Sequence, residues 1–280
     1  MLNMIKMDVY RMFRSKSLYV IWAIMVGMII FNSSMLKTQY DMMMEQADTY
    51  EVVTDETDEK VNVGMTVYVP MQPGEKVTVF DVLFSNLQSK FIALFLVIFA
   101  VIFSSADMNS GYIKNIGGQV KNREKLVISK AVSLIIFTVI SMAIAVLVQM
   151  ATNGIFLGYM ELGNVSNLAK YLSAQTLLHI ALVLIGMALS IVLKSNLVSM
   201  IIVVCLCMNL SMVIYAGINS FIQKMGVKDF SIIDYTVTGK ISMLSMEPAN
   251  KEFLSALLVA AVFGIAVTAL TGVIFKRRDI

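Results

Sequence analysis

Residues 126–150 read LVISKAVSLIIFTVISMAIAVLVQM, a run in which Lys130 is the one charged side chain. An α-helix rises 1.5 Å per residue, so about 20 apolar residues cross the roughly 30 Å of hydrocarbon in a bilayer. The run is therefore long enough to be a transmembrane helix. Reading the whole chain with the same window predicts six spans, at residues 18–36, 87–106, 126–150, 173–193, 197–217 and 253–275.

The composition of the 280-residue chain agrees with several spans. Hydrophobic residues make up 58% and charged residues 15%, against roughly 45–50% and 25% in soluble proteins. Three prolines, 15 glycines and two cysteines exclude collagen, low-complexity and disulfide-scaffold proteins. We therefore predict an all-α integral membrane protein, with a six-helix transmembrane domain over residues 17–280.

The charges between the spans predict the orientation of the chain. The two ends, the connection after the second span and the turn at Lys194 together hold 13 Lys and Arg against 4 Asp and Glu. The remainder of the chain holds 9 against 15. Because basic loops stay in the cytoplasm, both termini are expected there. The overall charge of +3 is therefore explained by the basic residues on the cytoplasmic side of the membrane. We expect no nucleic-acid partner.

The first 16 residues are expected to form an amphipathic helix at the membrane surface. On a helix, Leu2, Ile5, Val9, Met12 and Phe13 would lie along one stripe. Three cations, Lys6, Arg11 and Arg14, fall away from that stripe. This pattern is typical of a helix in the headgroup plane, although a frayed basic tail is the alternative.

Two long segments are expected on the outer side. In residues 37–86 an acidic first half is followed by alternating Val and polar residues at 61–69 and by VTVF at 77–80. The alternation has the period of a strand, so we predict a small extracellular β-hairpin. The second segment, residues 218–252, mixes apolar and polar residues in stretches too short to span. A short helix that enters the membrane part way fits this segment.

The sequence offers no pattern for catalysis. The nearest approach to a phosphate-binding loop is DYTVTGKI at 234–241, which has Asp in place of the first glycine and Ile in place of the hydroxyl residue. Neither a zinc-protease nor a serine-hydrolase motif occurs. We expect no catalytic residues, no metal site and no cofactor in this chain.

Polar side chains inside the spans are the candidates for a substrate path. Polar and ionisable groups at membrane depth are functional candidates by default, and the candidates here are Lys90, Gln175, His179 and Asn209. The alternative for His179 is a structural hydrogen bond to a neighbouring helix. In the last span Ala256, Ala260, Gly264, Thr268 and Gly272 recur every fourth residue, a seam of small residues that lets another helix pack closely.

The connection after the second span, FSSADMNSGYIKNIGGQVKNREKLVISK at 103–130, contains an acidic residue, a glycine, a short helical stretch, a glycine pair and a basic run. This pattern resembles the coupling region of permease subunits of type-2 ABC exporters, particularly bacterial antimicrobial-peptide export and immunity transporters. The residues that carry the resemblance are Asp107, Gly111, Lys114, Arg123 and Lys130.

The resemblance implies a mechanism and partners. A separate ATP-binding-cassette ATPase, holding ATP and magnesium, would dock on the coupling loop at 107–125, and a second permease chain, identical or different, would complete the path through the bacterial plasma membrane. Lys6, Arg11 and Arg14 would anchor an elbow helix to membrane lipid. The expected substrate is an amphipathic antimicrobial or toxin peptide. The alternatives are export of a lipid, drug or ion, or a non-transporting sensor or immunity protein that binds a peptide through its outer loop.

Overall fold

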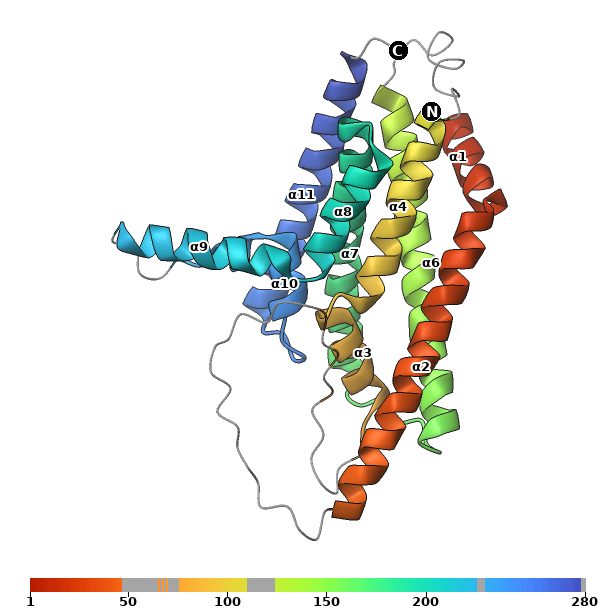
Figure 1. Cartoon of the computed structure of the whole chain (residues 1–280), viewed down its shortest axis with the longest axis vertical. Helices are drawn as coiled ribbons and strands as arrows, with labels where there is room; N and C mark the ends of the chain where they lie inside the picture. The colour runs from red at the N-terminus through yellow and green to blue at the C-terminus, as the bar shows by residue number, and fades with distance from the viewer. Residues whose placement is uncertain are drawn as a thin grey trace.

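The structure is a computed structural model that describes residues 1–46, 65, 67, 69, 76–109, 124–225 and 230–277. The described residues form a helical bundle without strands (Figure 1). Its elements are α1 (Leu2–Arg14), α2 (Lys16–Gln46), α3 (Val79–Gln88), α4 (Phe91–Asn109), α6 (Glu124–Phe156), α7 (Val165–Leu193), α8 (Asn196–Cys207), α9 (Leu210–Lys224), the 3-10 helix η1 (Ile232–Tyr235), α10 (Val237–Met243) and α11 (Asn250–Lys276).

Four helices of the described part, α2, α6, α7 and α11, are long and apolar enough to cross a membrane. The number rises to six if α3 with α4, and α8 with α9, each count as one broken span. Large apolar side chains on the outside of the bundle, including Ile24, Phe31, Leu258 and Ile265, are more than 50% exposed or close to it. Water would penalise such a surface and lipid would not, so this is a membrane-embedded protein.

The centre of the bundle is formed by α4 and α7. Helix α4 contacts α2, α3, α6, α7 and α8, and α7 also contacts α6, α10 and α11. Side chains on several sides of α4 are buried, among them Leu96, Val97, Phe99 and Val101. A helix that is apolar all round belongs in such a position. Helices α2 and α11 flank this core and bury only part of their surface.

Two predicted spans are broken, which the sequence did not indicate. The span predicted at 87–106 begins in α3 and bends by 51° at Ser89 and Lys90. The span predicted at 197–217 bends by 68° at Met208 and Asn209, and Figure 1 shows α9 running crosswise to the bundle. Lys90 and Asn209 adopt left-handed backbone conformations, with φ of 63° and 59°. Such a residue cannot continue a right-handed helix, so each bend has a local cause.

The returning strand predicted at 77–80 is wrong, because Val79 and Phe80 begin α3. Thr78 and Asp81 form a capping box that satisfies the first backbone N–H groups of this helix. Burial of Val79, Phe80 and Leu83 in the core then outweighs their preference for strands. The other predicted strand, at 61–69, lies outside the described residues except Met65, Val67 and Val69, which are not in a strand.

The N-terminal segment forms the predicted helix, α1, which packs against α6. Met12 from the predicted apolar stripe is buried, whereas Leu2 is 66% exposed. The sequence did not indicate the role of Asp8, which is buried and accepts a hydrogen bond from Ser129 of α6. Arg11 lies 3.8 Å from the same carboxylate. A charge-assisted contact therefore fixes α1 to the start of α6.

Candidate functional site

The two broken helices meet at their breaks. Lys90, between α3 and α4, is fully buried, and its Nζ donates a hydrogen bond to Oδ1 of Asn209, between α8 and α9. Both residues were predicted to lie on a substrate path, and the structure brings them into contact. Helix α8 has 12 residues and rises about 18 Å, a little over half of the hydrocarbon thickness. The contact therefore lies about 18 Å from the Asn196 end of this broken helix pair.

Helix α10 contacts the same region through α3 and α7. Gln88 at the end of α3 donates to the backbone oxygen of Ser242 at 3.0 Å, and the Ser242 hydroxyl donates to the backbone oxygen of Gln88 at 3.3 Å. The side chain of Gln175 on α7 donates to the backbone oxygen of Ile241 at 3.0 Å. These bonds tie α10 to both the α3 break and α7.

The third contributor is α7, through Gln175 and His179, both fully buried. They lie one turn apart, as predicted, and His179 Nδ1 is 2.7 Å from the backbone oxygen of Gln175. We call Gln88, Lys90, Gln175, His179, Asn209 and Ser242 the polar junction.

The polar junction contains buried polar atoms without hydrogen-bond partners. Nε2 of His179 and Oε1 of Gln175 are such atoms. Outside the junction, Oγ of Ser211, two residues after Asn209, also lacks a partner. Native proteins satisfy the great majority of buried polar atoms because each orphan costs about 1–3 kcal/mol. These atoms are therefore free to bind a further polar group.

A second buried polar cluster adjoins the junction on α3. Gln149 of α6 accepts from Asn86 at 3.2 Å and donates to Ser33, Thr152 and Asn153 at 2.9–3.2 Å. Asn86 in turn accepts from Asn32 of α2 at 2.7 Å. This network joins α2, α3 and α6 by hydrogen bonds between helices and leaves Nδ2 of Asn153 without a partner.

The residues predicted to couple to an ATPase are placed less completely. Asp107 lies in the last turn of α4, and Gly111, Lys114 and Arg123 lie outside the described residues. Lys130 is buried in α6, where its Nζ donates to the backbone oxygen of Phe103 at 3.2 Å and lies 4.4 Å from the centre of the Phe103 ring. Its described contacts are therefore with α4, inside the bundle.

Among the predicted anchors of α1, Lys6 and Arg14 are exposed, and Arg14 donates to the Tyr10 hydroxyl at 3.1 Å. Arg11 is partly buried beside Asp8. Sequence reasoning missed Gln88 and Ser242 as members of the polar junction. The sequence could have indicated Gln88, since a glutamine near Lys90 interrupts an apolar run. No feature of the sequence indicated Ser242.

The junction is chemically suited to binding a polar group. It offers amide, hydroxyl, imidazole and amino groups, and no carboxylate of the described residues takes part in it. Nor do the described residues contain a group of three or more His, Cys, Asp or Glu that could hold a metal ion. Cys205 and Cys207 are both free thiols.

Comparison with known proteins places most of the chain in one family. Residues 59–280 match the family described as "Protein of unknown function (DUF2705)". A search of curated proteins gives no match. The matched region includes α3 to α11 and the whole polar junction. The chain therefore belongs to the DUF2705 family.

Proposed function

We propose that this chain is the permease subunit of an ATP-driven exporter and has no catalysis of its own. The observation that carries the proposal is the meeting of two broken membrane helices at buried Lys90 and Asn209. Transport proteins use broken helices because the free ends of half-helices bind polar groups at membrane depth. Residues 103–130 resemble the coupling region of type-2 ABC permeases. This resemblance is the reason for proposing ATP hydrolysis by a separate subunit as the energy source.

The proposed topology has six crossings with both termini in the cytoplasm. In support, the start of α1 and the end of α11 lie at the same end of the bundle (Figure 1). That end holds Lys6, Arg11, Arg14, Lys276 and Arg277, as a cytoplasmic face should. Helix α1 would be the elbow helix along the inner leaflet, and α10 would be the re-entrant element on the outer side.

In the proposed mechanism, α4 transmits to Lys90 the movement that the ATPase causes in the coupling loop. This helix is continuous from Phe91 to Asn109, a length of about 28 Å, and it joins the coupling loop at 107–125 to Lys90. A rigid, buried helix conveys displacement along its axis with little loss. ATP-driven movement of the loop would pull Lys90 from Asn209 and let the junction exchange its partners, which is the two-state element that alternating access needs.

The proposed substrate is an amphipathic antimicrobial or toxin peptide, exported across the bacterial plasma membrane. The apolar bundle with a few buried polar groups fits a molecule that has both kinds of surface. A second permease chain would complete the path. The alternatives are a lipid, drug or ion as cargo, and a peptide-sensing role without transport.

The test is affinity purification of the chain in mild detergent, with mass spectrometry of the proteins that accompany it. We expect an ATP-binding subunit, lost on changing Gly111→Ala, Lys114→Gln and Arg123→Gln together. The matched control changes Gly217→Ala, Lys37→Gln and Lys251→Gln, which lie away from the coupling loop, and should retain the subunit. Absence of any ATPase from an intact, monodisperse preparation would overturn the proposal and favour the sensor.

A further inference from the structure

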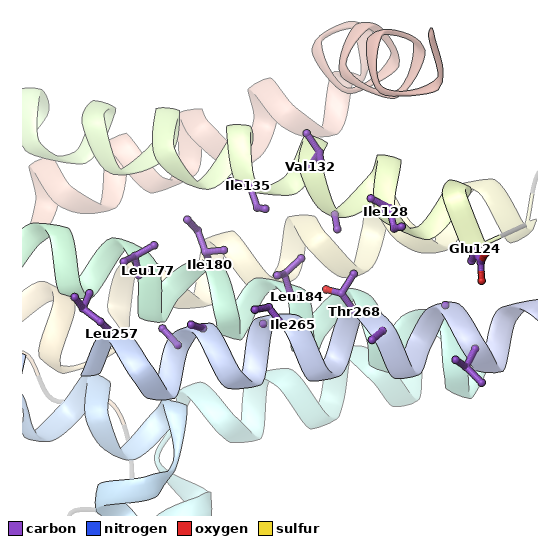
Figure 2. Close-up of a pocket in the computed structure, with 17 residues that line it drawn as sticks. Glu124, Ile128, Val132, Ile135, Leu177, Ile180, Leu184, Leu257, Ile265 and Thr268 are labelled. Carbon is purple, nitrogen blue, oxygen red and sulfur yellow. The ribbon is translucent and has the colours of Figure 1, made fainter. Parts of the chain in front are cut away.

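A long apolar groove runs along the outside of the bundle between α6, α7 and α11. Its volume is about 630 Å³. Figure 2 shows Leu177 and Leu257 toward one end, Leu184 and Ile265 in the middle, and Glu124 at the other end. From Leu257 to Val273 the lining part of α11 measures about 24 Å. Of all the lining residues, Glu124 alone is ionisable.

The groove exists because α11 carries small residues where it faces α6 and α7. Ala260, Gly264, Thr268 and Gly272 from the predicted seam all line it. A Cβ atom at Gly264 would lie 3.6 Å from Leu184, an ordinary contact, so the helices are close there without clash. The small side chains leave an open channel beside that contact instead of a filled interface.

The dimensions decide between two occupants, a helix and a single hydrocarbon chain. Spread over about 24 Å, the space open to the centre of a water-sized sphere is roughly 6 Å wide, and the sphere's own radius of about 1.4 Å on each side makes the groove roughly 9 Å wide. An α-helix with its side chains is about 10–12 Å across, wider than this groove. One extended hydrocarbon chain does fit, since carbon atoms pack at about 3.5–4.0 Å.

The charged end of the groove indicates which lipid supplies that chain. Lys276 Nζ lies 3.8 Å from Oε2 of Glu124, so the one lining carboxylate already has a cation beside it. Lys125 and Arg277 follow these two residues directly in the chain. Three cations against one carboxylate give this end a net positive charge, which complements an anionic headgroup.

We propose that the groove is a binding site for an anionic phospholipid. One acyl chain lies between α6, α7 and α11, and the phosphate lies at Lys125, Lys276 and Arg277. The acyl chain gains little on leaving the bilayer, because both surroundings are apolar. Selectivity therefore comes from the headgroup and weakens as salt screens the charges, with a Debye length of about 8 Å at 0.15 M. The site is independent of the proposed export function.

The experiment uses the full chain in lipid nanodiscs containing phosphatidylglycerol with a photoreactive group in one acyl chain. Mass spectrometry locates the adducts after illumination. We expect adducts concentrated on the lining residues of α6 and α11, at about fivefold higher yield than with the phosphatidylcholine analogue of the same chain. Changing Lys276→Gln and Arg277→Gln together should abolish the headgroup preference while capture of the acyl chain persists.

Variants that fill the groove test whether the adducts form inside it. Gly264→Phe places a ring in the channel, and Ala261→Phe, at an exposed lining residue, does so with less disturbance of packing. Both should remove the groove adducts. Gly27→Phe, on the exposed face of α2 with no atom within 4 Å of a new Cβ, should leave them unchanged. Adducts spread evenly over the lipid-facing surface, or equal yields for the two headgroups at low salt, would overturn the proposal.

Discussion

At the scale of single residues, Lys90 is the most demanding side chain in the chain. A fully buried amino group is expensive, and Lys90 also occupies a left-handed backbone position that costs about a further 1–2 kcal/mol. Asn209 offsets part of the first cost by accepting its hydrogen bond. The pair persists because the packed helices around it hold both residues in place, as is common where strain serves function.

Two substitutions of Asn209 distinguish the contribution of its side-chain hydrogen bond from that of its left-handed backbone conformation. Asn209→Gly removes the acceptor of Lys90 while keeping an easy left-handed conformation, so it should lower the free energy of unfolding by about 2 kcal/mol. Asn209→Ala adds backbone strain and should cost about 1 kcal/mol more. Unfolding in mixed micelles can be followed by the fluorescence of the single tryptophan, Trp22, which stacks on Phe137. Equal losses for the two variants would contradict this assignment.

Gln149 is the second residue whose removal should be costly, because it joins three helices. Gln149→Leu deletes its bonds to Asn86, Ser33 and Asn153, and it removes the acceptor of Asn86 Nδ2. Interhelical hydrogen bonds in membranes average about 0.6 kcal/mol each, so the loss should be about 1–3 kcal/mol in the same unfolding assay. Val139→Leu, at a half-exposed site on the same helix, should change stability by less than about 0.5 kcal/mol.

At the scale of elements, apolar length predicted the helices well but not their breaks. Residues 126–150 and 253–275 fall inside α6 and α11 because an uninterrupted apolar run has one stable structure in lipid. The run at 197–217 is equally apolar, yet it bends at Asn209, where the tertiary contact with Lys90 stabilises a left-handed residue. Such a contact joins positions 119 apart, so no local pattern could have indicated it.

Helix α10 supplies a test at this scale through Gly239. A Cβ atom there would lie 2.2 Å from the backbone oxygen of Ile233, so Gly239→Ala must push α10 away from η1. We expect a loss of roughly 1–3 kcal/mol in the free energy of unfolding. Gly217→Ala in α9 meets no atom within 4 Å and should instead stabilise by about 0.5–1 kcal/mol. Similar effects of the two changes would refute the close packing of α10.

At the scale of the whole molecule, the bundle has one strongly basic end and a polar junction, joined by α4. The sequence predicted the charged end, the apolar helices and four of the six junction residues. It did not predict that these four meet, since Lys90, Gln175, His179 and Asn209 come from separate parts of the chain. Nor did it predict the lipid groove, which depends on how closely α11 approaches α6 and α7.

The most direct test of the central claim is ATP-dependent movement of a fluorescent amphipathic peptide in vesicles that contain the chain and its co-purified ATPase. We expect transport by the unchanged protein and a loss of at least about tenfold in Lys90→Met, with the ATPase still bound. Lys251→Met, an exposed matched control, should transport normally. Unchanged transport in Lys90→Met, or no ATP-dependent movement by the unchanged protein, would contradict the account.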